Sequence, residues 1–151
     1  MIEKDELISL VPHRGKMYLL SRVNKYDLGV RCLEAEYDIT ESCLFYDPEA
    51  GGVPSWVSFE LIAQSVSVLF GLQRRAMGKE PKIGFVMSVS SVKSELPVFK
   101  AGTTAEIKVK EINNIDMVYT FEGFVFIEGR KVFEGKLTAM DVEKSPTFQK
   151  E

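Results

Sequence analysis

Two side chains of this sequence are suited to acid–base chemistry, one glutamate and the single histidine. Glu60 lies in an apolar stretch and shares the spacing i, i+4, i+7 and i+11 with Gln64, Ser67 and Gly71, which places all four on one narrow polar face of a helix. His13 is the only histidine, and imidazole ordinarily titrates near neutrality. Both residues also have a structural interpretation, since Glu60 could bind a backbone amide or a partner's arginine and His13 could hold a loop carbonyl.

Metal and nucleophilic chemistry have little support in the sequence. With one histidine and no C-x-x-C pair, the chain offers no credible set of zinc ligands, and no cofactor is implied. The spacing of Cys32 and Cys43 does not favour a Cys–His nucleophilic pair. In a reducing compartment, two cysteines are usually small buried hydrophobes.

Composition bounds the class of protein. The chain has 151 residues, 45% of them hydrophobic, which predicts a single domain over residues 1–151 with a polar tail at 143–151. A chain of this length buries about two thirds of its unfolded surface, so it needs neither a disulfide nor a metal to fold. Nineteen Lys and Arg residues against 22 Asp and Glu residues give a net charge of −3, which argues against nucleic acid as a partner.

Neither the N-terminus nor the longest apolar stretch resembles a membrane-targeting segment. The opening residues MIEKDELISLV carry charge where a secretory signal would have its apolar region. The apolar stretch at residues 56–72 contains Glu60, Gln64 and three serines, which argues against a membrane span. We therefore expect a cytoplasmic protein.

Residues 55–77 are predicted to form one long, buried helix. Ser55, just after Pro54, can cap its start, and Gly78 can end it. About 22 residues at 1.5 Å each make a rod roughly 33 Å long. Apolar residues occupy most of its circumference, and a helix that is apolar nearly all round is buried nearly all round.

The remaining chain is predicted to form strands around this helix. We expect a short helix at residues 3–11 that ends at Pro12, and an irregular loop rich in Pro and Gly at residues 40–54. The predicted strands are residues 17–26, 30–39, 83–94, 104–112, 117–127 and 131–142, with turns at 27–29, 113–116 and 128–130.

One long buried helix with five or six strands leaves few architectures. An antiparallel sheet that wraps the helix, an α+β arrangement, accounts for both the apolar helix and the strands. One helix cannot cover a whole sheet face and both of its edges. We therefore predict a dimer or a higher assembly, in which edges pair or faces are shared.

Three short motifs resemble the β-hydroxyacyl-acyl carrier protein dehydratases, which have the hot-dog fold. The residues PHR at 12–14 and MYLLSRV at 17–23 are similar to the family's opening P-H-R-x-P-F-L-L-V-D-R-V. The residues FELIAQ at 59–64 are similar to its central-helix motif L-E-A-M-A-Q. The likeness extends from about residue 7 to residue 142. It implies a curled antiparallel sheet around a central helix.

One position departs from the family pattern. The dehydratases carry a catalytic histidine in G-H-F-P-G-x-P-x-M-P-G, 14 residues before the helix glutamate, and counting back from Glu60 reaches Tyr46. Pro48 and Pro54 fall on the two framing prolines. The pattern is similar to a divergent branch of the dehydratases associated with aryl-polyene lipid gene clusters. Members of that branch keep the P-H-R and lack the loop histidine.

The resemblance implies dehydration of a 3-hydroxyacyl thioester on an acyl carrier protein, in fatty acid or aryl-polyene lipid synthesis. This reaction needs a base near the α-carbon, an acid near the β-hydroxyl, and donors on the thioester oxygen. The resemblance implies that Glu60 is the acid. His13 remains the candidate base. Candidate substrate-binding residues are Tyr46, Pro54, Ser55, Trp56 and Gln64, with phenylalanines 121, 124 and 126 as candidate lining of an acyl tunnel. A basic cluster that could meet an acidic carrier protein comprises Arg74, Arg75, Lys79 and Lys82.

Two other functions remain open from the sequence. The missing loop histidine favours a non-catalytic hot-dog subunit that binds acyl chains or supports an active partner. A third alternative is an acyl thioesterase, since other hot-dog proteins hydrolyse acyl thioesters with a helix carboxylate.

Overall fold

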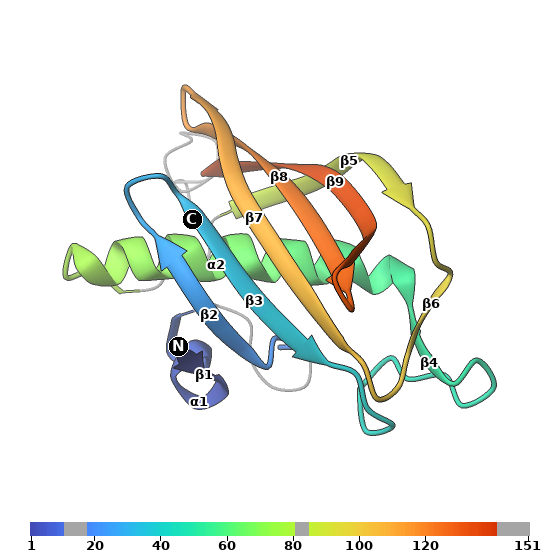
Figure 1. Ribbon diagram of the computed structural model, residues 1–151. Coiled ribbons are helices and arrows are strands. Elements are labelled where there is room, and N and C mark those ends of the chain that lie inside the picture. Colours follow the sequence, from blue (N-terminus) through green and yellow to red (C-terminus); the bar gives the residue numbers. More distant parts are fainter. Residues whose placement is uncertain (11–17, 81–84, 142–151) are drawn as a thin grey trace, which may run out of the picture.

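An antiparallel sheet curled around one long helix forms the core of the protein (Figure 1). The computed structural model describes residues 1–10, 18–80 and 85–141. In chain order the elements are β1 (Ile2–Glu3), α1 (Lys4–Leu7), η1 (Ile8–Leu10), β2 (Arg22–Asp27), β3 (Cys32–Asp38), β4 (Gly52–Pro54), η3 (Ser55–Val57), α2 (Ser58–Ala76), β5 (Phe85–Ser94), β6 (Val98–Lys100), β7 (Thr104–Ile115), β8 (Val118–Ile127) and β9 (Arg130–Asp141). The predicted polar tail lies outside the described residues.

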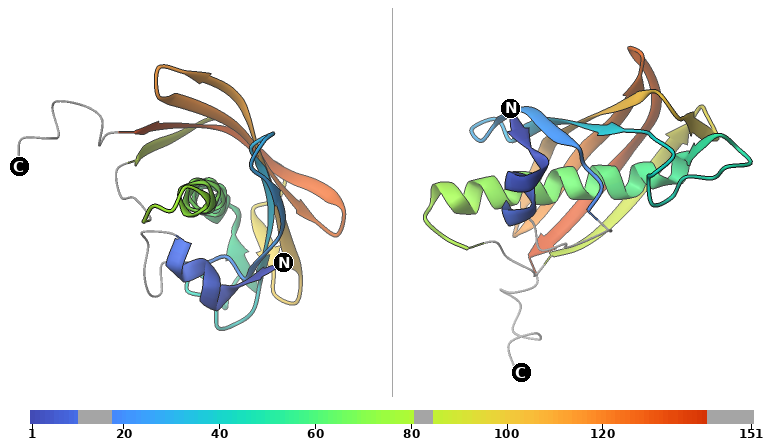
Figure 2. Two further views of the ribbon diagram at one scale, coloured as in Figure 1. Left: turned by 90° about the vertical axis from the view of Figure 1, so that its left-hand side faces the viewer. Right: turned by 90° about the horizontal axis from the view of Figure 1, so that it is seen from below.

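Seven strands make the main sheet, in the order β1-β2-β3-β7-β8-β9-β5. Every neighbouring pair is antiparallel, and β4 and β6 pair separately as a short two-stranded sheet. Seen along α2, the sheet curls around one side of the helix while α1 lies on another (Figure 2). The expected α+β hot-dog architecture is therefore confirmed.

The long helix ends as the sequence predicts but begins differently. Gly78 adopts a positive φ of 73°. Its N–H donates to the carbonyl of Arg75, and the N–H of Lys79 donates to the carbonyl of Arg74. These two bonds complete a Schellman motif, which only a residue without a Cβ forms freely. The prediction of Ser55 as a cap is wrong, because no side chain caps either η3 or α2.

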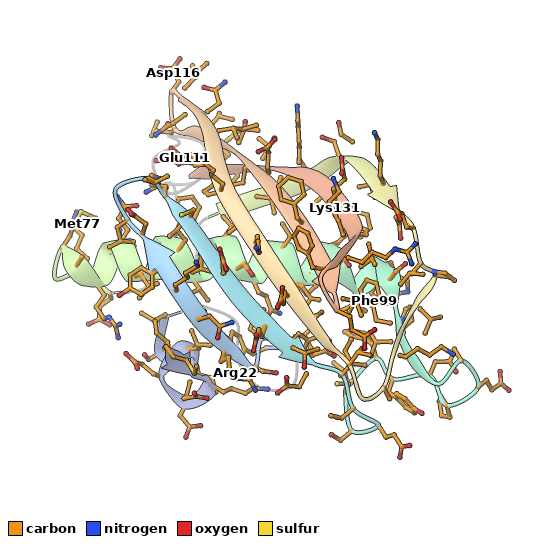
Figure 3. The ribbon with its side chains drawn as sticks, viewed as in Figure 1. Arg22, Met77, Phe99, Glu111, Asp116 and Lys131 are labelled. Atoms are coloured by element: carbon orange, nitrogen blue, oxygen red, sulfur yellow. The ribbon has the colours of Figure 1, made fainter. Side chains whose placement is uncertain are left out.

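The β7–β8 hairpin is longer than predicted. β7 continues to Ile115 through a bulge after Glu111. The turn is Asp116–Met117 rather than residues 113–116, and both residues have positive φ, 51° and 67°. Such a two-residue turn matches the twist of the strands, and Asp116 lies at the tip of the hairpin (Figure 3). The alternation predicted for the first part of β7 is confirmed, since Ala105, Ile107 and Val109 are buried.

The polar face of α2 is the side on which the N-terminal segment packs. A Cβ added at Gly71 would lie 2.0 Å from the carbonyl oxygen of Leu10. The absent side chain therefore lets the backbone of η1 lie directly against the helix. From Leu61 to Leu72 every residue of α2 except Ala63 is buried, which confirms the prediction for the middle of the helix, whereas its first and last turns are partly exposed. By length and composition Ser55–Ala76 could cross a membrane, but 72% of its most apolar window is buried inside the fold, as in the core helix of a globular protein.

Gly71→Ala is expected to destabilise the protein. The added methyl must displace the backbone of Leu10, and overpacking of this kind costs about 1–3 kcal/mol, more than the gain of about 1 kcal/mol in helix propensity. Urea unfolding measures the change. Ser67→Ala, on the same helix face without added volume, is the matched control and should remain close to the parent. A Gly71→Ala variant as stable as the parent would mean that Leu10 moves aside freely.

Candidate functional site

Glu60 lies in the first turn of α2, half-buried, where the helix dipole favours a negative charge. Its Oε2 accepts a hydrogen bond of 2.9 Å from Nε2 of Gln64, one turn further along the helix. Gln64 is fully buried, and its Oε1 accepts a bond of 2.8 Å from the backbone N–H of Leu19. The structure thus links the carboxyl of Glu60 to the segment that leads into β2.

The entry to the helix is held by the short β4–β6 sheet. Pro54 pairs with Val98 in that sheet, and the N–H of Ser55 donates to the carbonyl of Pro97 at 2.9 Å. The Ser55 amide is therefore occupied. Ser55–Val57 form a 3-10 turn that starts at Pro54, and in such a turn the N–H of the third residue bonds to the carbonyl three residues before it. The amide of Trp56 is therefore the backbone donor at the helix start best suited to an acyl oxygen.

Trp56 and Tyr46 lie where two stretches of chain meet, the loop after β3 and the start of the helix. Trp56 is 52% exposed, and its ring packs edge-on against Phe45 at 5.1 Å. Tyr46 is half-buried, and its N–H donates to the carbonyl of Cys43 at 3.0 Å. An exposed tryptophan one turn before Glu60, packed on a partly buried phenylalanine, suits a surface that contacts an apolar ligand or another subunit.

Two of the candidate residues, His13 and Lys82, lie outside the described residues. The other three residues of the basic cluster, Arg74, Arg75 and Lys79, lie in or just after the last turn of α2. Fourteen residues separate Glu60 from Arg74, or roughly 21 Å along a helix. Arg74 donates its Nε to the carbonyl of Glu80 at 2.6 Å, and Arg75 forms an ion pair of 3.0 Å with Glu6. Lys79 is exposed.

The suggestion that three phenylalanines of β8 line an acyl tunnel is wrong for two of them. Phe121 is buried beneath the sheet, where its ring contacts Phe70 at 5.8 Å. Phe124 and Phe126 alternate to the outer face. There Lys131 lies over the ring of Phe124 and Lys108 over that of Phe126. The sequence showed an aromatic run in this strand, but it did not show which of the three phenylalanine rings face the helix and which face outward.

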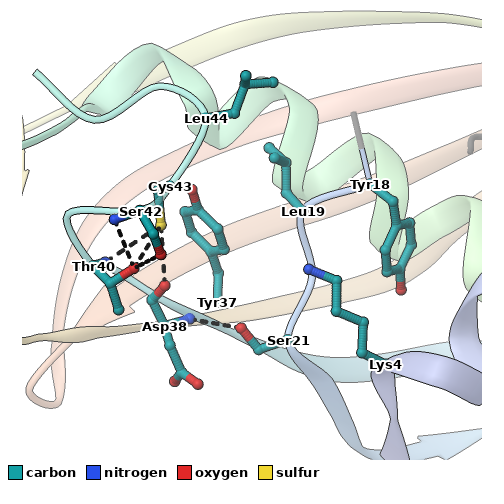
Figure 4. A pocket seen from close by; sticks show the side chains of 10 residues that line it. All are labelled: Lys4, Tyr18, Leu19, Ser21, Tyr37, Asp38, Thr40, Ser42, Cys43 and Leu44. Carbon is teal, nitrogen blue, oxygen red and sulfur yellow. Dashed lines mark hydrogen bonds between the residues drawn. The ribbon is translucent and has the colours of Figure 1, made fainter. Parts of the chain in front are cut away.

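A pocket of about 510 Å³ lies between the N-terminal segment and the loop after β3, and sequence reasoning did not identify it (Figure 4). Its lining includes Leu19, whose N–H anchors Gln64. Burial raises the pKa of the Tyr18 and Tyr37 phenols above the usual value, so both remain neutral. No three metal-ligating side chains gather anywhere within residues 1–10, 18–80 and 85–141.

An ion-pair group borders this pocket on the outer side of the sheet. Arg22 binds the carboxylates of Glu36, at 2.5 Å, and Asp38. The hydrogen bond from Arg22, with a further one from Thr104, holds the pKa of Asp38 below its usual range. The group ties β2 to β3 and thereby supports the segment that contacts Gln64.

Comparisons with known proteins agree with this geometry. A family model described as ApeP dehydratase, from the ApeP-like family, matches residues 6–150. The 3-hydroxyacyl-[acyl-carrier-protein] dehydratase FabZ of Erythrobacter litoralis is 28% identical over 138 residues, which cover 89% of each chain. The dehydratase heterocomplex ApeI:P from Xenorhabdus doucetiae has a TM-score of 0.84 at 19% identity, over 95% of both chains. A hypothetical thioesterase with coenzyme A from Streptococcus pneumoniae has a TM-score of 0.59 at 14% identity, over 78% of this chain and 82% of its own.

Asp38→Asn is expected to lower the free energy of unfolding at pH 7 by about 1 kcal/mol or less, because the Arg22 pair is partly exposed. Since the folded pKa of Asp38 is lowered, the stabilisation is complete above the ordinary value of about 3.9 and is lost as the pH falls below it. Urea unfolding at pH 7 and near pH 3 should show a difference that shrinks at acid pH. Asp5→Asn, at an exposed carboxylate, is the control, and a difference independent of pH would contradict the assignment.

Proposed function

Because the chain belongs to the ApeP-like dehydratase family, we propose that it dehydrates a 3-hydroxyacyl thioester of an acyl carrier protein to a 2-enoyl thioester. The observation that carries this proposal is Glu60, a carboxyl in the first turn of the buried helix, held by Gln64. We place the reaction in the cytoplasm, in fatty acid or aryl-polyene lipid synthesis. No cofactor is part of the proposal.

The proposed roles follow from the balance of the reaction. A base removes the proton from the α-carbon, and the electron pair left behind forms the double bond as the β-hydroxyl leaves. Glu60 gives that hydroxyl a proton, so that water departs. His13 is proposed as the base on sequence grounds alone. The amide of Trp56 at the start of the helix is proposed to bind the thioester oxygen, with Tyr46, Pro54 and Ser55 forming the walls around it.

A second candidate is a subunit that requires another hot-dog subunit for activity. Tyr46 stands where the dehydratases carry their loop histidine, and a similar solved structure is a dehydratase heterocomplex. A third candidate, thioester hydrolysis, has in its favour a fold shared with a hypothetical thioesterase. Incubation with a 3-hydroxyacyl thioester, with and without a second dehydratase subunit, separates the three. A dehydratase active alone would give water and an enoyl thioester, and a thioesterase would release a free thiol. A subunit that requires a partner would give no product unless that partner is added.

Glu60→Gln is expected to lower the dehydration rate about 100-fold or more, because it removes the proposed proton donor. His13→Ala should cause a similar loss if the imidazole is the base. Folding of each variant is checked by circular dichroism, and Glu41→Gln, at an exposed carboxylate, is the control. Near-full activity of Glu60→Gln would reject the mechanism. Loss with Glu60→Gln but not with His13→Ala would return His13 to a structural role.

The carrier protein is proposed to dock on the basic cluster at the end of α2. Carrier proteins are acidic, and charge steering accelerates such encounters. The double variant Lys79→Glu and Lys82→Glu should weaken carrier binding several-fold, and added salt should reduce the difference. Lys100→Glu with Lys136→Glu, two exposed lysines elsewhere, changes the net charge equally and is the control. Equal effects of both double variants would show that the cluster is only a solvated face.

We propose that β5, an edge strand of the sheet, joins a second hot-dog subunit. Ten residues of unpaired edge would otherwise leave a template for uncontrolled pairing. Light scattering at micromolar concentration should report a dimer or a larger assembly. A monomer under these conditions would count against this arrangement.

A further inference from the structure

Three segments meet at the C-terminal end of α2, and one arginine holds them together. Arg31, in the turn between β2 and β3, has its guanidinium 5.2 Å from the ring centre of Phe70 on α2 and 5.5 Å from that of Tyr119 on β8. It also forms an ion pair of 2.5 Å with Glu111 on β7. The β2–β3 turn and the β7–β8 hairpin are therefore fastened to the last turns of the helix.

The helix face on which Arg31 lies continues to the end of α2. Phe70, Arg74 and Met77 follow the spacing i, i+4 and i+7, so their side chains share one face. The end of α2, the β2–β3 turn and the β7–β8 turn all lie on the left-hand side of Figure 1, which faces the reader in the left view of Figure 2. Figure 3 labels Met77 and Asp116 on this side.

Large apolar side chains are exposed on all three segments. Met77 is 55% exposed, Val30 in the β2–β3 turn 54%, and Ile115 beside the β7–β8 turn 61%. Met117, in that turn, is exposed as well. A single exposed apolar side chain needs no explanation, but several on adjoining segments at one end of a protein mark an interaction site. We call Val30, Met77, Ile115 and Met117 the apolar end surface.

Charge indicates what covers this surface. Basic residues stand on both sides of Met77 in the sequence, namely Arg74, Arg75 and Lys79, and they attract a negatively charged partner. In a symmetric contact between two copies of the chain, these same cations would face one another. At a bilayer of anionic lipid, Asp116 at the tip of the hairpin would meet like charge. An acidic protein with apolar side chains among its carboxylates meets neither objection.

We propose that the apolar end surface completes the docking site of the acidic carrier protein, with Met77 as its anchor. This inference rests on the proposed docking of the carrier at the basic cluster. Charges accelerate the encounter and are screened by salt, whereas a buried apolar contact slows dissociation. Methionine suits the role of anchor because its flexible, polarisable side chain adapts to the surface that it meets.

The test measures the rates at which a purified acyl carrier protein, without an acyl group, binds and leaves the protein at low and high salt. Met77→Ala should raise the dissociation rate about fivefold or more and leave the association rate within about twofold, at both salt concentrations. Met77→Leu keeps an apolar side chain and should follow the parent. Lys79→Glu with Lys82→Glu should instead slow association, and chiefly at low salt. Leu44→Ala, at an exposed residue of the loop after β3, is the control.

A dissociation rate unchanged in Met77→Ala, or a parent that does not bind the carrier, would overturn the proposal. So would unchanged carrier kinetics together with lost binding to phosphatidylglycerol vesicles or a smaller assembly, which would identify a bilayer or a second copy as the occupant. Dehydration of a 3-hydroxyacyl thioester of N-acetylcysteamine, which needs no carrier, tests the proposed function separately. A parent that shows the Met77 effect but dehydrates no such thioester, alone or with a second subunit, would reject the dehydration and leave the docking site intact.

Discussion

Burial of one helix inside a curled sheet is the constraint on which the rest of the structure depends. α2 packs against β3, β7, β8 and β9, and burial withdraws water from its polar groups, so each must find a partner inside the protein. Gln64 meets this requirement with bonds that include those to Leu19 and Glu60, and Gly71 meets it by carrying no side chain at all. The contacts that close the uncovered side of the helix are therefore also those that hold the carboxyl of Glu60.

The first turn of α2 joins the fold to the chemistry. The β4–β6 sheet has only three residues in each strand, yet it determines where the helix begins, because Ser55 donates to Pro97 at the end of that sheet. That bond uses the amide of Ser55, the first amide of the turn that leads into the helix. Close backbone approach makes the sheet possible: a Cβ on Gly52 would lie 2.1 Å from the carbonyl oxygen of Phe99.

Backbone hydrogen bonds hold the loop between β3 and β4. Asp47 pairs with Gly52 across it, and Tyr46 donates its amide to Cys43. Its geometry thus depends on backbone bonds rather than on the side chain at position 46.

Local pattern was sufficient for the architecture. The apolar helix with Gly78 after it, and the alternation in β7, are each encoded within a short window, where periodicity and turn chemistry act directly. The turn after β2 is equally local, since the Asp27 carboxylate accepts the N–H groups of Gly29 and Val30. The position of Glu60 on the same helix face as Gln64 was also predictable from their spacing. Tertiary structure alone decided the longer β7, the outward direction of Phe124 and Phe126, the occupied amide of Ser55 and the bond between Gln64 and Leu19. Leu19 and Gln64 are 45 residues apart. The partner of a buried polar group is whichever donor the folded chain brings to it, and no local periodicity specifies that donor.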